Sequence, residues 1–445
     1  MAKFKTQADN VHSTLREWML VDGLEVVYDT EKSKGSRFVD ALSGNEYIDL
    51  FSFFASMPVG HNHPGLDDPS FREKLMAAAL VKPSNSDIYT TAMADFVATF
   101  GRTMPEGYKN LFFIEGGGLA VENALKVAFD WKVRKNVEKG LLSGDGDPDL
   151  GTKALHFRNA FHGRTGYTLS LTNGFSANKT KYFPKFPWPR VTAPGCRFPV
   201  EGENLEMVKA AEAATLQEIH DALAANPNDI GAIILETIQG EGGDVHFRPE
   251  FLKALRDLCD NEEVCLVFDE VQAGMGLTGK WWAFEHMGVQ PDVFSFGKKA
   301  QVCGVAAAER INEVDSCFKV SSRINSTWGG NLVDMVRCAR YVEIIEENDL
   351  LTNATNVGEH LLGKLRELEH DFEQVSNSRG LGLMLAFDLP SPEARDRLIS
   401  ALWDAHTMVL PCGPNSVRFR PFLDITMDDA NLAADRIRTA LGAMG

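Results

Sequence analysis

The chain has 445 residues, 44% of them hydrophobic, and a formal net charge of -17. This length and apolar content exclude a small module and a disordered chain, and they indicate a soluble protein with two domains. The negative charge, with Lys and Arg dispersed along the chain, argues against nucleic acid and anionic membranes as partners.

The seven cysteines are odd in number, and none lies in a C-x-x-C pair. We therefore expect reduced thiols and neither a zinc site nor a redox-active cysteine pair. The first ten residues hold no apolar stretch of the signal-peptide type, and no run of about 18 apolar residues occurs anywhere in the chain. These features predict a cytoplasmic protein that spans no membrane.

Short half-apolar stretches, such as residues 25–28 and 47–54, fill the first seventy residues and predict a small antiparallel unit. Beyond it, apolar runs of strand length alternate with segments of helical period. The expected strands are residues 111–114, 154–157, 230–238, 264–271 and 292–296, and the expected helices are residues 119–131 and 249–259. This alternation predicts an α/β fold, in which a mainly parallel sheet is covered by helices on both faces.

After about residue 331 the chain turns helical, over residues 333–347 and 354–370. It is then expected to end in short strands around residues 383–389 and 417–419. We therefore predict three segments. Residues 1–70 would contribute to a small domain, residues 71–335 would form a large domain that binds the ligand, and residues 336–445 would form the C-terminal small α+β domain.

The glycine-rich segment after the strand at residues 264–271 matches a dinucleotide-binding motif in part. Gly274, Gly276 and Gly279 have the G-x-G-x-x-G spacing. The next predicted strand, however, ends in Gly297 and Lys298, where a dinucleotide-binding unit would carry an acid for the ribose hydroxyls. The motif therefore gives little support for a nucleotide cofactor.

Extended to Lys280, the same segment reads G-x-x-x-x-G-K, the pattern of the phosphate-binding loop of ATPases. The next residue is Trp281, which has no hydroxyl for a magnesium ion, and the acidic strand comes before the loop instead of well after it. An ATPase remains an alternative to be excluded. It predicts that a bound nucleotide raises the thermal stability of the protein.

Asp269 and Lys298 each lie at the carboxyl end of a predicted parallel strand. Open α/β sheets bind ligands at this edge, so the two side chains are expected to lie near each other. A lysine that forms a Schiff base and a carboxylate that pairs with a protonated pyridine nitrogen are the groups that a pyridoxal-phosphate enzyme needs most. The pair therefore indicates pyridoxal 5'-phosphate as cofactor.

A glycine loop offers a place for the cofactor's phosphate. The predicted strand at residues 111–114 is followed by Gly116, Gly117 and Gly118 and then by a predicted helix. Free backbone N–H groups and the helix dipole suit a dianion there. Taken singly, a glycine loop before a helix is commonly just a turn, an aspartate at a strand end is commonly a cap, and most lysines are solvated. Their occurrence together favours the cofactor.

These motifs resemble the class III, ornithine-aminotransferase-like, fold-type I aminotransferases, and the resemblance runs from about Asp22 to the C-terminus. The most specific match is residues 268–274, followed by Pro291 with Asp292 and by Gly297 with Lys298. The resemblance implies a pyridoxal-phosphate-dependent transfer of an amino group. It also implies that the large domain binds the cofactor.

The resemblance assigns the cofactor's contacts residue by residue. Gly117 and Gly118 would hold the phosphate, Phe161 and Val271 the two ring faces, Asp269 the pyridine nitrogen, Gln272 the phenolic oxygen, Lys298 the Schiff base, and Thr327 the phosphate of the partner subunit. The active site would then be shared between the subunits of an obligatory homodimer. Lys299 is the second choice for the Schiff base. Judged alone, Phe161 would be a core residue and Thr327 a helix cap.

Two substrates bind in turn to an enzyme of this kind, an amino acid whose distal amine reacts and 2-oxoglutarate. Arginine suits the carboxylates of both, because its planar fork grips a carboxylate at two points. In the family pattern Arg164 holds the α-carboxylate of the diamino acid and Arg418 holds that of 2-oxoglutarate. Glu241 would mask Arg418 while the diamino acid is bound. Without the resemblance, a structural Glu241–Arg418 pair is equally plausible.

Four segments resemble the lysine 6-aminotransferase branch of the family: residues 82–87, 236–244, 297–304 and 325–330. Asn325 and Phe54 complete the implied substrate side. Phe54 stands where ornithine aminotransferases have a tyrosine near the substrate carboxylate, and this departure weakens the ornithine interpretation.

The resemblance thus implies that the ε-amino group of L-lysine passes to 2-oxoglutarate. The products would be glutamate and 2-aminoadipate 6-semialdehyde, which cyclises to piperideine-6-carboxylate. The 4-aminobutyrate aminotransferases share the Lys298–Lys299 pair and remain the first alternative. An ornithine aminotransferase and an aminomutase or decarboxylase of the same fold are the others.

Overall fold

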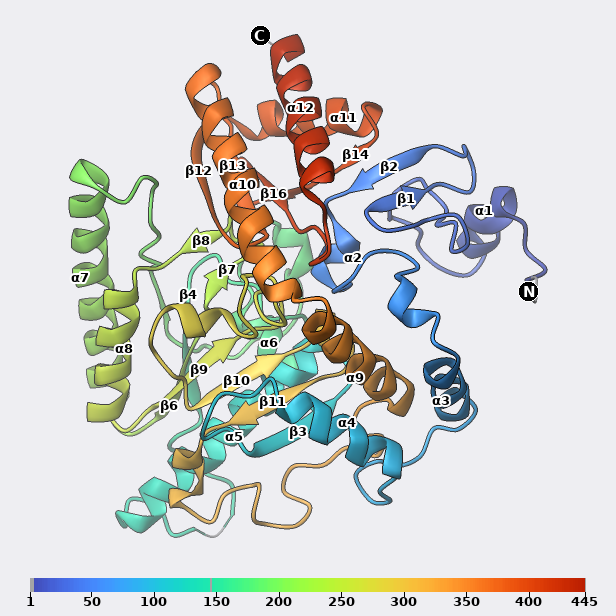
Figure 1. Cartoon of the computed structure of the whole chain (residues 1–445). Helices are drawn as coiled ribbons and strands as arrows, with labels where there is room; N and C mark the ends of the chain where they lie inside the picture. Colours follow the sequence, from blue (N-terminus) through green and yellow to red (C-terminus); the bar gives the residue numbers. More distant parts are fainter. Residues whose placement is uncertain (1–3, 145, 445) are drawn as a thin grey trace.

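A seven-stranded sheet forms the centre of the computed structural model, which describes residues 4–144 and 146–444 (Figure 1). Its strands lie in the order β3 (Asn110–Ile114), β11 (Cys303–Ala307), β10 (Val293–Phe296), β9 (Cys265–Asp269), β6 (Ile230–Glu236), β4 (Lys153–Phe157) and β5 (Arg190–Val191). Strand β11 is antiparallel to both neighbours, and every other pair is parallel. The predicted α/β fold with a mainly parallel sheet is confirmed.

Helices cover both faces of this sheet. Helix α5 (Gly117–Glu138) packs against one face in a hydrophobic cluster that includes Ala232 and Ile234 of β6. Helices α4 (Thr91–Gly101), α8 (Pro249–Asn261) and α9 (Leu332–Glu347) pack against the other face, in the cluster that includes Ile233 and Leu235. Every residue of β6 is buried as a result, which explains its nearly continuous apolar sequence.

A second, antiparallel sheet lies in the C-terminal part of the chain. Its strand order is β12 (Ser376–Leu381), β13 (Met384–Asp388), β16 (Ser416–Phe419) and β15 (Leu410–Cys412). Apolar side chains of α10 (Leu350–Asp371), α11 (Pro392–Asp404) and α12 (Met427–Met444) share one core with this sheet. The core also includes residues from distant parts of the chain, such as Ile48, Leu50 and Ile238.

The N-terminal segment pairs with the C-terminal part of the chain. Strands β1 (Arg37–Val39) and β2 (Glu46–Asp49) form an antiparallel pair, and β14 (Thr407–Met408) runs parallel to β2. The domain boundaries expected after residues 70 and 335 stay predictions.

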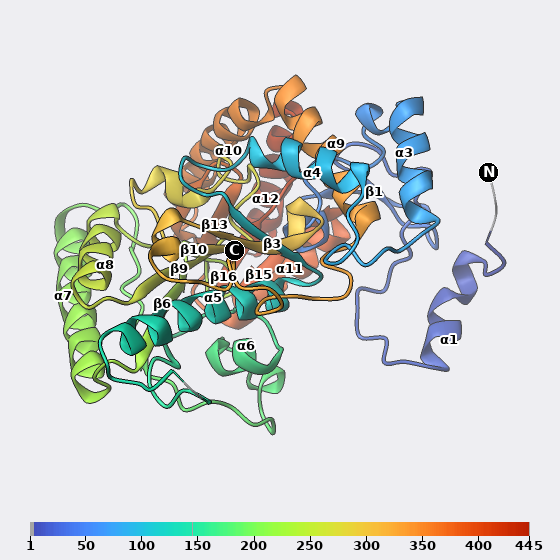
Figure 2. The same ribbon diagram turned by 90° about the horizontal axis from the view of Figure 1, so that it is seen from below.

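The remaining elements are η1 (Ala8–Asn10), α1 (Val11–Arg16), α2 (Ser52–Ala55), η2 (Pro64–Leu66), α3 (Pro69–Ala79), α6 (Gly166–Leu171), η3 (Ala177–Lys179), α7 (Gly202–Ala225), β7 (Ile238–Gln239), β8 (Val245–His246), η4 (Ala283–His286), η5 (Lys298–Ala300) and η6 (Glu309–Glu313). They include α3 and α7, which add side chains to the core beside the large sheet, and the two-stranded sheet of β7 and β8. Figures 1 and 2 agree that α7 and α8 lie side by side at one edge of the molecule and that α1 lies at the opposite edge.

Several expected strands differ from the observed ones. The strand expected at residues 47–54 ends at Asp49, because its carboxylate accepts the N–H groups of Phe51 and Ser52 and turns the chain. Residues 25–28 form no strand; only Tyr28 makes an isolated bridge. The run at residues 230–238 is divided between β6 and β7, and the chain ends in α12 instead of in strands.

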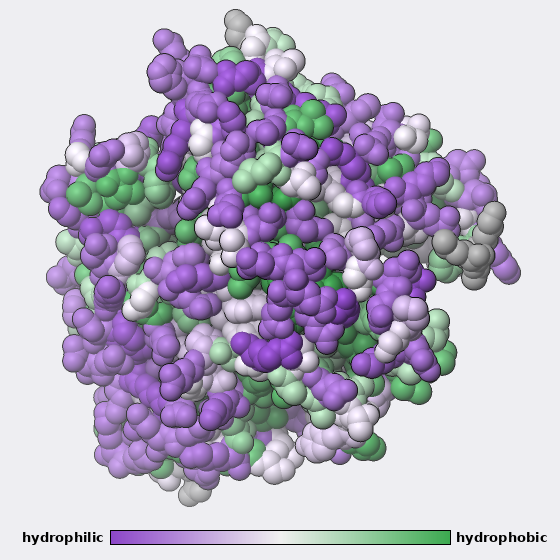
Figure 3. Space-filling view, in the orientation of Figure 1, coloured by the Kyte–Doolittle hydropathy of each residue, from purple (hydrophilic) through white to green (hydrophobic). Residues whose placement is uncertain are grey.

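The face of the molecule seen in Figure 3 carries mostly hydrophilic side chains, with hydrophobic ones in scattered patches. Over residues 4–144 and 146–444, no helix combines the length and the apolar character that crossing a membrane requires.

Two glycines of α10 test how closely this helix packs. A Cβ at Gly358 would lie 2.1 Å from the carbonyl oxygen of Gly382, whereas a Cβ at Gly363 would meet nothing within 4 Å. We predict that Gly358→Ala lowers the free energy of unfolding by roughly 1–3 kcal/mol, because backbone atoms must move. Gly363→Ala should raise it by up to about 1 kcal/mol through helix propensity. Thermal unfolding followed by circular dichroism checks both variants. Equal changes in the free energy of unfolding would contradict the close contact between Gly358 and Gly382.

Candidate active site

A cavity of about 190 Å³ lies at the carboxyl edge of the parallel strands. Its lining residues are Gly117, Gly118, Phe161, His162, Gly163, Glu236, Ile238, Asp269, Val271, Gln272 and Lys298. Seven of the eight residues predicted to bind the cofactor are among them. The strand order explains this grouping, because β6, β9 and β10 are adjacent and their carboxyl ends lie at the same edge.

Asp269 is the last residue of β9 and is buried, with 5% of its surface exposed. Its Oδ1 accepts hydrogen bonds from Ser295 Oγ (3.1 Å) and from the N–H of Val271 (3.1 Å). Ser295 is the register partner of Asp269 in the β9–β10 pair. The carboxylate is therefore fixed by the same strand pairing that brings the end of β10 alongside it.

His162 is a buried partner of Asp269 that sequence reasoning missed. Its Nδ1 lies 2.8 Å from Asp269 Oδ2, and its Nε2 is buried without a hydrogen-bond partner among the described residues. Burial opposes protonation of the imidazole, but the hydrogen bond and charge of Asp269, with the charge of Glu236, outweigh it and raise the pKa of His162. The signal available in the sequence was the place of His162 directly after Phe161.

Glu236 is the second missed residue, at the end of β6. Its two carboxylate oxygens accept the N–H groups of Phe161 and Gly240, each at 2.9 Å. Burial raises the pKa of Glu236 to about 7, with the charge of Asp269 adding to the effect and His162 opposing it. Glu236 therefore holds the backbone of Phe161 at the cavity wall and adds a titratable group behind it.

Lys298 lies two residues beyond the end of β10, at the first position of η5 and with a φ of 49°. Its amine makes no hydrogen bond or ion pair with the residues of the described chain. Burial lowers the pKa of this amine, although the charge of Asp269 opposes the shift. Lys299 points elsewhere, because its Nζ donates to the carbonyl of Ala55 at 2.8 Å. Of the two lysines, only Lys298 lines the cavity.

The glycine loop begins α5 at the cavity. Gly116 precedes the helix with a φ of 91°, a conformation that favours glycine. A Cβ at Gly117 would come within 2.9 Å of Val271 Cγ1, and one at Gly118 within 3.3 Å of Thr165 Oγ1. The absence of side chains therefore keeps the start of the helix open to an anion.

Gln272 connects the cavity to two buried arginines, Arg418 on β16 and Arg420 directly after this strand. Its Oε1 accepts hydrogen bonds from Arg420 Nε (3.0 Å) and Arg418 Nη1 (3.3 Å). Arg418 is 7% exposed and its Nε has no partner among the described residues. Burial lowers the pKa of Arg418, an effect that a nearby charge such as that of Glu241 opposes.

The predicted pairing of Glu241 with Arg418 is not formed in this structure. Glu241 Oε1 instead lies 2.5 Å from Lys179 Nζ, and Glu241 Oε2 is buried without a partner among the described residues. Lys179 was not singled out from the sequence, because no motif marks it. Its position at the end of η3 became visible only with the fold.

The other predicted substrate and partner residues lie on the surface, outside the cavity lining. Arg164, Asn325 and Thr327 are exposed, and Phe54 is 56% exposed within a left-handed turn. One chain alone does not bring these four residues to the cavity.

The glycines at residues 274–279 serve packing. No helix follows them directly. A Cβ at Gly276 would lie 2.7 Å from Leu423 Cδ1, and one at Gly279 would lie 2.1 Å from Thr355 Oγ1. The segment therefore lacks the loop-to-helix step that both nucleotide-binding motifs require.

Comparison with known proteins gives one consistent result. The family model described as aminotransferase class-III matches residues 20–441. The chain is 51% identical to the L-lysine-epsilon aminotransferase of Mycobacterium tuberculosis over 98% of this chain and 96% of that protein. It is 30% identical to the mitochondrial 4-aminobutyrate aminotransferase of Homo sapiens over 92% of this chain and 84% of that protein.

The chain belongs to the class-III aminotransferases. A solved lysine aminotransferase from M. tuberculosis, in the internal aldimine form, matches it with a TM-score of 0.95 at 51% identity over 99% of this chain and all of that one. The expected family and α/β fold of a class-III aminotransferase are confirmed, and the ATPase alternative is set aside.

The charge of Asp269 should control the protonation of His162. We predict that Asp269→Asn, which keeps the shape of the side chain, lowers the pKa of His162, because burial alone disfavours the charged imidazole. The imidazole should then lose its proton at a lower pH than in the unmodified protein. NMR titration of labelled histidine, assigned with His162→Gln, measures the shift. Ser295→Ala removes a hydrogen bond from Asp269 but no charge, so an equal shift in that variant would contradict the prediction.

Proposed function

We propose that this chain is a pyridoxal-phosphate-dependent L-lysine ε-aminotransferase. The observation that carries the proposal is one cavity lined by Lys298, Asp269 and the glycine loop, in a chain half identical to proteins with that name. The amino group of L-lysine would pass to 2-oxoglutarate, giving glutamate and the semialdehyde. A 4-aminobutyrate aminotransferase is the second candidate, because relatives of that name match over most of the chain.

The cavity residues fit pyridoxal phosphate. Lys298 presents an unpartnered amine to the cavity, Asp269 offers a buried carboxylate for the pyridine nitrogen, and Phe161 and Val271 line the walls. The phosphate would occupy the start of α5 at Gly117 and Gly118, where a Cβ would crowd the side chains of Val271 and Thr165. His162 also lines the cavity, and its Nε2 is buried without a partner among the described residues. The aldehyde, the ring and the phosphate each have a matching group.

The cofactor, when bound, supplies an electron-withdrawing ring that stabilises negative charge on the substrate carbon next to the reacting amine. Lys298 is the base that removes the proton from that carbon. Burial lowers the pKa of its amine, which favours the neutral form that a base requires. Asp269 holds a proton on the pyridine nitrogen, and His162 fixes the orientation of Asp269 from behind.

Two arginines select the substrates. Arg418 is a buried guanidinium with a free Nε and would bind the α-carboxylate of 2-oxoglutarate or glutamate. Arg164 would bind the α-carboxylate of L-lysine, so that the ε-amine and not the α-amine reaches the reacting carbon. Asn325 and Phe54 would complete this substrate side. The alternation of the two substrates predicts ping-pong kinetics.

A homodimer with shared active sites completes the proposal. Several large apolar side chains are exposed on the single chain, among them Trp18, Leu20 and Tyr89, as a subunit interface requires. Thr327, also exposed, would reach the phosphate bound by the partner subunit. Sedimentation equilibrium should give a dimer, and a stable monomer that remains fully active would contradict the shared site.

Lys298 should be the lysine that bonds to the cofactor. We predict that the purified protein with pyridoxal phosphate absorbs visible light and that borohydride fixes the cofactor to Lys298. Lys298→Ala should lose this label and lower turnover by roughly 10²–10⁴-fold or more. Lys299→Met, which keeps most of the apolar stem, should retain the label on Lys298. Peptide mapping by mass spectrometry distinguishes the two lysines, and a label on Lys299 would overturn the assignment.

The proposed substrate is tested by offering three amino donors in parallel. With 2-oxoglutarate present, L-lysine should give both glutamate and the six-membered cyclic imine, whereas ornithine and 4-aminobutyrate should give at least tenfold lower kcat/KM, equivalent to about 1.4 kcal/mol. Higher activity with either of the other amines would keep the chemistry but reject L-lysine. No glutamate from any amine would instead favour an aminomutase or a decarboxylase.

A further inference from the structure

Glu241 has a cationic partner at the cavity wall that none of the family motifs includes. Lys179, at the end of η3, places its Nζ 2.5 Å from Glu241 Oε1 and 5.5 Å from the centre of the Phe161 ring. Phe161 lines the cavity. The ion pair therefore lies beside the position where substrate and cofactor are expected.

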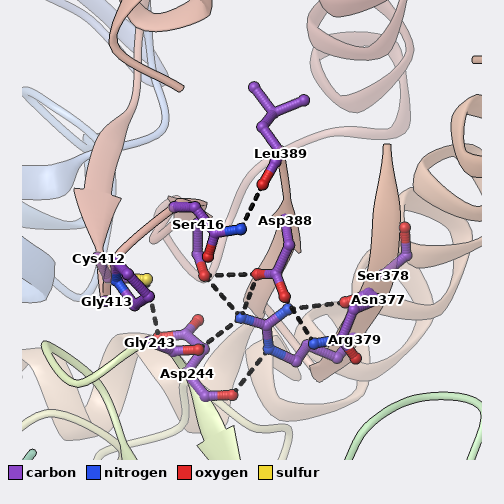
Figure 4. Close-up of polar contacts among 12 residues, drawn as sticks. Gly243, Asp244, Asn377, Ser378, Arg379, Asp388, Leu389, Cys412, Gly413 and Ser416 are labelled. Atoms are coloured by element: carbon purple, nitrogen blue, oxygen red, sulfur yellow. Dashed lines mark hydrogen bonds and ion pairs between the residues drawn. The ribbon is translucent and has the colours of Figure 1, made fainter. Parts of the chain in front are cut away.

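The backbone around Glu241 is held by the C-terminal sheet. The N–H of Gly413 donates to the carbonyl of Glu241 at 2.8 Å. Arg379, on β12, donates from Nη2 to the carbonyl of Gly243 (2.5 Å) and from Nε to that of Asp244 (3.0 Å), as Figure 4 shows. We call these contacts the loop clamp.

A buried ion pair strengthens the loop clamp. Arg420 and Asp244 are 1% and 0% exposed, and Arg420 Nη1 donates to Asp244 Oδ2 at 2.8 Å. With the backbone fixed on both sides, the freedom left to Glu241 is that of its side-chain torsions. Gly174 leaves room for the carboxylate, because a Cβ there would lie 2.6 Å from Glu241 Oε2.

Glu241 and Arg418 each keep one unused hydrogen-bonding atom. Glu241 Oε2 and Arg418 Nε are both buried without a partner among the described residues, and the charge of Glu241 acts on the pKa of Arg418. Buried polar atoms without partners are costly, so both groups are poised to gain a contact. For Arg418 that contact is either the Glu241 carboxylate or a substrate carboxylate.

We propose that Lys179 is a specificity-determining positioning residue that competes with Arg418 for Glu241. While Lys179 holds Glu241, Arg418 is free to bind the α-carboxylate of 2-oxoglutarate or glutamate. When Glu241 turns to Arg418, the guanidinium is neutralised and the site accepts the ε-amine of the diamino acid. Lys179 is 29% exposed, so water can solvate its released charge. This inference rests on the proposed function, because it divides the two substrates between two states of one carboxylate.

Lys179→Met tests the proposal, because it removes the charge and keeps most of the stem beside Phe161. Glu241 should then turn to Arg418 and weaken the binding of dicarboxylates. In the holoenzyme we expect the Kd of glutarate, a dicarboxylate without a reacting carbonyl, to rise by roughly tenfold or more in calorimetry. The Kd of 2-oxoglutarate in the single-turnover half-reaction should rise equally, whereas the half-reaction with L-lysine should change by less than about threefold.

Three further variants separate positioning from general damage. Lys179→Arg should restore glutarate binding, because it restores the charge. Lys181→Met changes an exposed lysine two residues away that contacts the Tyr182 ring, and it should have no effect. In a Glu241→Ala background, Lys179→Met should add nothing, since Lys179 acts through Glu241.

Two results would overturn the inference. One is an unchanged Kd of glutarate in Lys179→Met. The other is that Lys179→Met raises the Kd of glutarate by the same factor in the Glu241→Ala background as in the unmodified protein. Failure of the proposed function is recognised separately, because the unmodified holoenzyme would then fail to react with L-lysine. The glutarate comparison would still report on Lys179 in that case.

Discussion

The parallel pairing of β6, β9 and β10 is the constraint on which the rest of the site depends. In this register Glu236 and Ser295 are both partners of Asp269, so three strand ends are level at one edge of the sheet. Lys298 follows three residues after Ser295. A slip of one residue in either pair would turn the side chains to the opposite face, and the cavity would lose its acid.

Burial and pairing act against each other at this edge. Glu236, Asp269 and His162 are all buried, and charged groups in such surroundings are stable only when they are paired or hydrogen-bonded. Asp269 raises the pKa of His162 and so favours the protonated imidazole. Among the described residues, Glu236 accepts hydrogen bonds only from two backbone N–H groups, and burial raises its pKa. The arrangement keeps negative charge directed at the position expected for the pyridine nitrogen, with an imidazole behind it to limit the electrostatic cost.

The sequence was sufficient to predict the positions of residues that lie at or just beyond the end of a single strand. Asp269 and Lys298 each follow an apolar run, and the rule that parallel strands end at one edge brings them together. His162 could not be placed in the same way, because its bond to Asp269 joins residues 107 positions apart. The position of Lys179 depends on the path of an irregular segment, and such segments have no hydrophobic periodicity from which their structure can be predicted. The strand expected at residues 47–54 failed for a local reason, the hydrogen bonds of the Asp49 side chain.

The loop clamp has a consequence for time scales. Because Arg379 and Gly413 fix the backbone beside Glu241, its carboxylate can change partner by rotation of side-chain bonds alone. Rotations of exposed side chains take picoseconds to nanoseconds, and hinge motions of domains take microseconds to milliseconds. The Glu241 side chain is 18% exposed and must first leave Lys179, so its rotation is slower than that of an exposed side chain but needs no hinge motion. The choice between the two substrates would thus be made without any rearrangement of a domain. The affinity of the bound carboxylate, and not the speed of the rearrangement, would decide which substrate is retained.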